Sequence, residues 1–195
     1  MSSLRERKRI RTRQALIDAA AELFERRGYD GTTIADIAAA ADVSTRTFFS
    51  YFASKEDVLF PDADARVKAA QTAIDERRPG EGPTELLLRG LAELGDAGDD
   101  LVGPMAALRL RFIRTVPSVR GYGLQRQLDA QTEIAARLHA AFPDELDEVE
   151  AAALVGAFVG AVAGALEVLL RDAHDPDVVR ERLQRATAVA LRPWV

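Results

Sequence analysis

Thr45, Arg46 and Thr47 are the consecutive side chains best suited to contact another molecule. The planar guanidinium of Arg46 can donate two parallel hydrogen bonds to a guanine, and Thr47 can meet a thymine methyl group or a phosphate. Ser50 and Tyr51 follow about one helical turn later and suit phosphate oxygens, which position a protein on DNA without reading its sequence. The cluster therefore predicts contact with duplex DNA.

Residues 33–60 supply the elements that would position this cluster. Thr33, with Asp36 three residues later, predicts the capped start of a short helix. A turn at Asp42 and Val43 leads to Ser44, which we expect to cap a second helix over about 44–51. This is the pattern of a helix-turn-helix, in which the start of the second helix enters the major groove.

The ends of neighbouring helices add further candidate contacts. Ser54 predicts another helix start, where Lys55 and free backbone N–H groups could hold a phosphate, and Thr33 could do the same. Phe48 and Phe52 are four residues apart and are expected to pack inward. The complete candidate set for DNA binding is Thr33, Ser44, Thr45, Arg46, Thr47, Phe49, Ser50, Tyr51 and Lys55.

A helix-loop-helix corner of an ordinary bundle is the alternative interpretation, and the distribution of charge argues against it. The net charge is −5, yet residues 1–13 hold six basic side chains against the single acid Glu6. A basic arm beside a nearly neutral domain is compatible with phosphate contact. The acidic remainder of the chain is expected to face away from DNA.

Composition limits the kinds of site, the location and the fold class that this chain can have. The 195 residues include no cysteine and two distant histidines, His139 and His174, so we expect no disulfide, no metal site and no cofactor. The start shows no secretory signal, and a cytoplasmic location is expected. Abundant Ala, Leu, Arg and Glu predict an all-α protein of about nine helices. The expected helices are 9–27, one capped by Thr33, 44–51, 55–78 with an irregularity around Pro61, 84–95, 102–115, 118–141, 144–173 and 176–191, with a loop over 95–103.

The expected organisation has a flexible basic arm (1–8), a helix-turn-helix domain (9–54) and a larger ligand-binding and dimerisation domain (55–195). Residues 151–166 carry no charge. They are too short, and too rich in Ala and Gly, to favour a membrane span. Glycines at every fourth position instead suggest close helix packing in a dimer, with an intramolecular core as the alternative. The predicted interface residues are Gly156, Gly160, Gly164, Val179 and Leu183.

A ligand would lie among the helices of residues 84–171. The candidate wall residues are Met105, Leu108, Arg109, Phe112, Tyr122 and Phe158. Apolar and aromatic residues of this kind are more often plain core than ligand contacts. Arg109, Arg111 and Arg114 lie close together on one expected helix, and one that points inward could hold a carboxylate or a phosphate, although such arginines are usually solvated.

Residues 9–60 resemble the DNA-binding domain of the TetR family of transcriptional regulators. The matching pieces are ALIDAAAELF (15–24), GYDGTT (28–33), Ile37-Ala38, Val43-Ser44, FFSYF (48–52) and Ser54-Lys55-Glu56. Phe49 departs from the tyrosine that the family often has, which puts one phosphate contact in doubt. The resemblance implies a homodimer with one ligand pocket per subunit, and a ligand that lowers operator affinity by changing the spacing of the recognition helices.

The favoured interpretation is a ligand-responsive dimeric regulator, most simply a repressor released from a palindromic DNA operator by a mainly apolar or amphipathic molecule. Its expected partners are the operator, a second copy and that effector, with no membrane. A helical enzyme, or a small-molecule-binding protein without operator specificity, is the alternative; no nucleophile–base, metal-ligand or phosphate-loop pattern supports an enzyme. A third possibility is an architectural DNA-binding protein without an effector.

Overall fold

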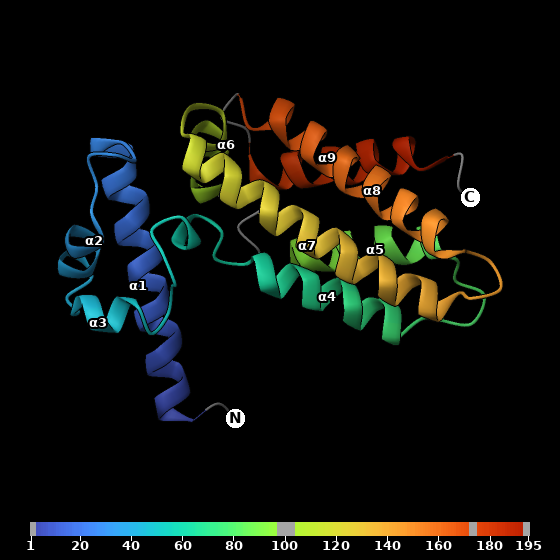
Figure 1. Ribbon diagram of the computed structural model, residues 1–195, viewed down its shortest axis with the longest axis horizontal. Coiled ribbons are helices and arrows are strands. Elements are labelled where there is room, and N and C mark those ends of the chain that lie inside the picture. Colours follow the sequence, from blue (N-terminus) through green and yellow to red (C-terminus); the bar gives the residue numbers. More distant parts are fainter. Residues whose placement is uncertain (1–2, 97–103, 172–174, 193–195) are drawn as a thin grey trace. The chain divides into compact units, whose positions relative to one another are not determined.

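The computed structural model describes residues 3–96, 104–171 and 175–192. His174 and nearly all of the expected loop over 95–103 lie outside these residues. Within them the chain forms nine α-helices and one 3₁₀ helix and has no strand, so the all-α prediction is confirmed (Figure 1). The helices are α1 (Leu4–Arg27), α2 (Ile34–Ala40), α3 (Thr45–Phe48), η1 (Asp57–Leu59), α4 (Ala63–Asp75), α5 (Pro83–Asp96), α6 (Pro104–Thr115), α7 (Pro117–Ala141), α8 (Glu148–Leu169) and α9 (Pro176–Ala190).

The chain folds as two compact units. Unit 1 comprises residues 1–61 and 104–122, and unit 2 comprises residues 62–103 and 123–195. Residues 55–61 and the whole of α6 therefore belong with the helix-turn-helix, whereas they were expected from the sequence in the second domain. Helix α7 contributes its first residues to unit 1 and the remainder to unit 2.

Unit 1 is built around α1, which packs against α2, α6 and η1. Leu16, Phe24 and Ile37 are fully buried. The Phe24 ring stacks on Tyr29 at a centroid distance of 5.6 Å and meets Phe112 of α6 edge-on at 5.7 Å. This aromatic cluster joins α6 to the helix-turn-helix.

Unit 2 is a helical bundle in which α4 packs on α5, α8 packs on α9, and α5 also contacts α9. Leu86 of α5, Leu138 of α7 and Leu154 of α8 meet in its buried core. One side of each of these three helices therefore faces the core.

The local signals for helix ends are confirmed. Gly28 ends α1 with a positive φ of 71°, as only glycine adopts without strain. Thr33 and Asp36 form a reciprocal capping box at the start of α2. Ser44 caps α3 by accepting a hydrogen bond from the Thr47 N–H. In the turn between α2 and α3, Asp42 has a φ of 54°.

Several expected helix bounds were wrong. Helix α1 starts at Leu4 rather than residue 9, because Ser3 caps it by accepting from the Glu6 N–H; the described part of the expected arm is therefore mostly helical. The long helix over 55–78 is broken into η1 and α4 around Pro61, whose ring and missing N–H oppose a continuous helix. Helix α8 starts at Glu148 rather than residue 144, where Asp147 and Glu150 form a capping box.

Candidate nucleic-acid interface and cavity

Helix α3 is a single turn of four residues, shorter than the expected 44–51. Its start is fixed by Ser44, whose Oγ accepts from the Thr47 N–H at 3.1 Å. At the other end the Ser50 hydroxyl donates to the Thr47 carbonyl at 2.6 Å. Phe48, the last residue of the helix, and Phe52 are both buried, as predicted. Packing below and polar bonds at both ends therefore hold α3 rigidly.

The outer face of α3 carries the candidate contacts. Thr45 and Arg46 are exposed, as are Phe49 and Ser50 just after the helix. Thr47 and Tyr51 are half-buried. The structure thus brings the predicted cluster onto one short, exposed segment that an incoming DNA groove can reach.

Two of the predicted contacts are engaged in other roles. The Thr33 hydroxyl donates to Asp36 Oδ2 at 2.5 Å, and this bond lowers the pKa of the Asp36 carboxyl. Lys55 Nζ donates to the carbonyl oxygens of Tyr29 and Thr32, both at 2.9 Å. Lys55 therefore fastens the α1–α2 loop, a role that its position in the sequence does not reveal.

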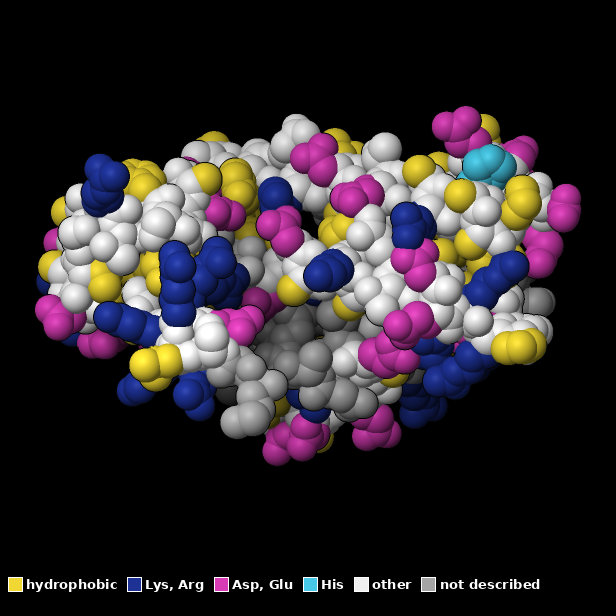
Figure 2. All heavy atoms as spheres, turned by 90° about the horizontal axis from the view of Figure 1, so that it is seen from below, with side chains coloured by type: hydrophobic (Ala, Val, Ile, Leu, Met, Phe, Trp, Pro, Cys, Tyr) yellow, Lys and Arg dark blue, Asp and Glu magenta, His cyan; other side chains and the backbone are white. Residues whose placement is uncertain are grey.

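Basic side chains crowd the first half of α1. Arg5, Arg7, Lys8, Arg9 and Arg11 are all exposed. Positive charge at a helix N-terminus opposes the helix dipole, so these residues gain from an external anion. In Figure 2, Lys and Arg side chains are visible on the left, over unit 1, as well as on the right. The basic arm predicted from the sequence is thus present as a basic helical extension.

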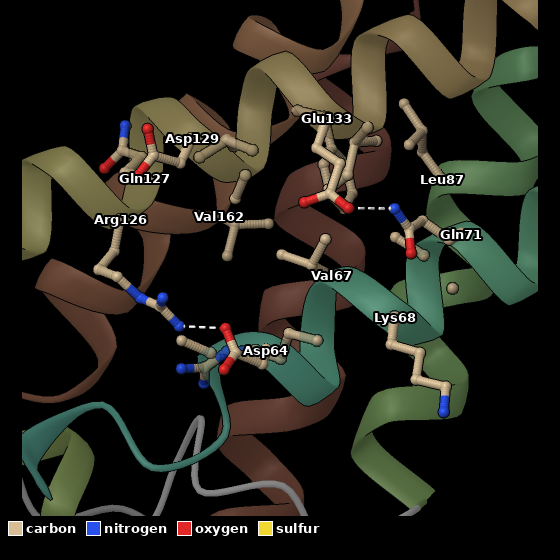
Figure 3. A pocket seen from close by; sticks show the side chains of 18 of the residues that line it. Asp64, Val67, Lys68, Gln71, Leu87, Arg126, Gln127, Asp129, Glu133 and Val162 are labelled. Carbon is tan, nitrogen blue, oxygen red and sulfur yellow. Dashed lines mark hydrogen bonds and ion pairs between the residues drawn. The ribbon is translucent and has the colours of Figure 1, made fainter. Parts of the chain in front are cut away.

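Unit 2 contains a cavity of about 610 Å³, within the range of small-molecule sites (Figure 3). Its walls are mainly apolar and come from α4, α5, α7 and α8. The apolar lining consists of Ala63, Val67, Ala70, Leu87, Gly90, Leu91, Ala130, Ile134, Phe158, Val159 and Val162. The polar lining consists of Asp64, Arg66, Lys68, Gln71, Arg126, Gln127, Asp129 and Glu133.

Polar bridges between α4 and α7 border this cavity. Arg126 forms an ion pair with Asp64, and the Gln71 amide donates to Glu133 at 2.6 Å (Figure 3). Both bridges join residues 62 positions apart. The equal separation means that α4 and α7 run in the same direction along one edge of the cavity. Long side chains link the two helices there.

Only Phe158 of the six predicted ligand residues lines this cavity. Met105, Leu108, Arg109, Phe112 and Tyr122 lie in unit 1. Phe112 fills the aromatic cluster on α1, Arg109 donates to the Leu59 carbonyl, and Tyr122 donates to Asp57 at 2.8 Å. The large side chains of α6 are thus used in the core of unit 1. No local sequence motif marks the α4 and α7 residues that line the cavity instead.

The predicted dimer residues fall on two different faces. Val179 and Leu183 are each 1% exposed and pack inside the chain's own core. Gly160 and Gly164 are exposed, Gly156 is half-buried, and a Cβ added at any of the three meets nothing within 4 Å. Of the five predicted interface residues, the three glycines of α8 are therefore the ones that the chain's own core leaves uncovered. By length and composition α8 could cross a membrane, with a mean hydropathy of 2.1 and 22% of that window buried.

Comparison with known proteins matches these features to regulators. Residues 16–60 fit the family model described as "Bacterial regulatory proteins, tetR family". The HTH-type transcriptional regulator TcmR of Streptomyces glaucescens is 39% identical over 137 residues, which are 69% of this chain and 60% of TcmR. HbdR of Aromatoleum sp. (strain CIB), another such regulator, is 48% identical over 48 residues, 25% of this chain and 21% of HbdR. The chain thus spans less than two thirds of these relatives.

Solved structures share the fold. Thermus thermophilus FadR, a TetR-family repressor solved with lauroyl-CoA, has a TM-score of 0.60 at 21% identity, covering 94% of this chain and 95% of FadR. A transcriptional regulator from Aquifex aeolicus gives 0.58 at 20% identity, covering 91% and 98%. Since the family model spans the residues that build α2, the turn and α3, and TcmR extends the likeness over most of the chain, this protein belongs to the TetR family of bacterial regulatory proteins.

Proposed function

We propose that this protein is a dimeric transcriptional regulator, in the first place a repressor, that leaves its DNA operator when a small molecule fills the cavity of unit 2. The observation that carries the proposal is the capped, exposed segment of α3 within a matched DNA-binding domain. DNA binding is assigned to unit 1, and effector binding to unit 2. The expected location is the cytoplasm, where both DNA and metabolites are accessible.

On DNA, Arg46 is assigned to base readout in the major groove. It is exposed, and within the described residues it has no hydrogen bond or ion pair that would hold it elsewhere. Thr45, Thr47, Phe49, Ser50 and Tyr51 surround it, while the starts of α2 and α3 offer backbone N–H groups to phosphates. The basic extension of α1 supplies the general attraction to the duplex.

Dimerisation is assigned to the exposed face of α8 together with α9. Its open glycines allow a second helix to approach closely. Helix α8 is highly apolar, yet most of it is left unburied in the single chain, so a partner that covers this face would remove apolar surface from water. Val168 of α8 and Val178 and Val189 of α9 are further exposed apolar side chains on these two helices. A second copy would cover this surface in water, which removes the need for a membrane.

The effector is assigned to the mainly apolar cavity bordered by α4 and α7. The acyl-CoA of FadR shows that this fold can hold an amphipathic ligand in another protein. Phe158 and the apolar residues of α5 and α8 would contact the ligand's apolar body. The polar bridges between α4 and α7 would contact its polar end.

Two measurements test the proposal: the mass of the protein–DNA complex, and its dissociation by an effector. We expect native mass spectrometry to show two copies of the chain on one duplex chosen by the protein from a random pool, and an effector to dissociate them. Binding of a single copy would contradict the dimer. A complex that no molecule bound in the cavity can dissociate would favour the architectural alternative.

A further inference from the structure

We propose that the molecule held in the cavity of unit 2 is an amphipathic carboxylate whose head group takes the place of Asp64 on the guanidinium of Arg126. This inference rests on the proposed function, in which the cavity holds an effector, and it adds the chemical class of that effector. The observation behind it is that the carboxylates lining the cavity are more exposed to solvent than the two arginines that line it.

The acidic lining residues lie in water. Asp64, Asp129 and Glu133 are all exposed, and the Asp64 side chain is 88% exposed. The two arginines that line the same cavity, Arg66 and Arg126, are half-buried, and the Arg126 side chain is 31% exposed. Lys68, the third positive lining residue, is exposed. The two guanidinium groups are therefore the charges held closest to the apolar interior, where an anion would gain most.

The resident partner of Arg126 can be exchanged. Asp64 reaches Arg126 from the first turn of α4, as Figure 3 shows, and an ion pair with one member in water contributes little to stability. Asp64 would regain its hydration on leaving. The planar guanidinium can then bind a ligand carboxylate through two parallel hydrogen bonds.

The second bridge is a weaker site for a charged head group. Glu133 is exposed and accepts a hydrogen bond from the neutral amide of Gln71 at 2.6 Å. In Figure 3 the Lys68 side chain points away from this pair. A cationic head group would thus meet a carboxylate that water already solvates, which makes an amine the less favoured ligand.

Isothermal titration of the full-length protein with dodecanoate, dodecanol and dodecylamine tests the proposal, because the three probes share one tail. We expect dodecanoate to bind at least about tenfold more tightly than dodecanol, as one strong charged contact would give. Arg126→Gln should remove this preference. Asp64→Asn should strengthen dodecanoate binding, since the internal competitor is lost; a purely structural role of the pair would not produce that gain.

Two control variants locate the effect. Glu133→Gln alters the other α4–α7 bridge and should leave the order of the three affinities unchanged. Ala130→Phe fills the cavity and should abolish binding of every probe, with circular dichroism confirming the fold of each variant. Binding of dodecanoate that survives Ala130→Phe would place it elsewhere and overturn the proposal.

Other outcomes separate this inference from the proposed function. Tighter binding of dodecylamine, lost in Glu133→Gln, would overturn the carboxylate and keep the cavity as an effector site. Equal binding of dodecanoate by wild type and Arg126→Gln would also overturn it. Binding of none of the probes would overturn the inference, whereas the regulatory function would fall only if selection from random duplexes yielded no operator.

Discussion

Lys55 Nζ lies 3.9 Å from the centre of the Tyr29 ring and donates to the Tyr29 carbonyl oxygen at 2.9 Å. A second bond of the same length reaches the Thr32 carbonyl. One ammonium group thus holds the loop that sets α2, and through it α3, against α1. The residue expected from the sequence to meet a phosphate has a positioning role in the fold.

Lys55→Met should therefore lower the stability of the protein. Loss of hydrogen bonds from a charged group to two partly buried carbonyls is expected to reduce the free energy of unfolding by about 1–3 kcal/mol. Chemical denaturation measures this change, and the salt dependence of DNA affinity should stay as in the wild type. Unchanged stability with a salt slope reduced by about one would instead restore the phosphate contact.

Arg46→Lys should relax sequence preference while it retains the charge. A lysine lacks the fork that bonds guanine bidentately, so discrimination between a selected operator and a scrambled duplex should fall by about 1–3 kcal/mol. Competition binding on the two duplexes measures the difference. An equal loss of affinity for both would show that Arg46 contacts only the DNA backbone.

Features that depend on local chemistry are the ones that could be predicted from the sequence. The caps at Thr33 and Ser44 and the stop at Gly28 depend on neighbours within a few residues, so they are readable from the chain alone. The inward packing of Phe48 and Phe52 follows from their spacing. The helix-turn-helix, as a local unit, was therefore predictable.

Contacts between distant segments could not be read in this way. The faces of α9 show why, because Val179 and Leu183 point into the core, whereas Val178 and Val189 are exposed. Both sets are apolar, and the positions of α5 and α8 decide which of them is buried. The cavity likewise depends on how α4 and α7 align, which no short motif encodes.

Replacing Arg5, Arg7 and Lys8 together by glutamine should weaken DNA binding without destabilising the fold. Each phosphate contact that is lost should lower the slope of log affinity against log salt by about 0.9. The helix should keep its stability, because these charges oppose the dipole at the start of α1. A salt slope identical to that of the wild type would mean that the extension does not touch DNA.

Gly160→Leu should separate the dimer and leave the single chain folded. A Cβ at this position meets no atom of the chain within 4 Å, so only a partner helix would clash with the larger side chain. Gly121→Leu on α7 is the matched control, since it is equally open and belongs to unit 1, whereas the proposed interface is built from unit 2. Sedimentation that shows dimers in both variants would contradict the α8 interface.

Unit 2 should lose stability in acid partly through Glu81. Arg89 donates to both Glu81 oxygens, at 2.6 and 3.0 Å, and these bonds lower the pKa of the carboxyl below its ordinary 4.5. The unfolded chain therefore takes up the proton first, so the contribution is present above pH 4.5 and disappears as the pH falls through the lowered pKa.

The comparison of wild type with Glu81→Gln measures this contribution. The difference in unfolding free energy between the two should be largest above pH 4.5 and should shrink below it. Glu145→Gln, at an exposed site without an ion pair among the described residues, is the control. A difference that does not vary with pH would show that the Glu81–Arg89 pair is not the cause.

Selection from a random duplex library, followed by sequencing of the retained DNA, tests the central claim most directly. We expect a two-fold palindrome, because two copies joined through α8 would present two α3 segments to two half-sites. Arg46→Lys should weaken the consensus at the bases that this residue reads. Retention without any shared sequence, or no retention at all, would contradict operator recognition by this protein.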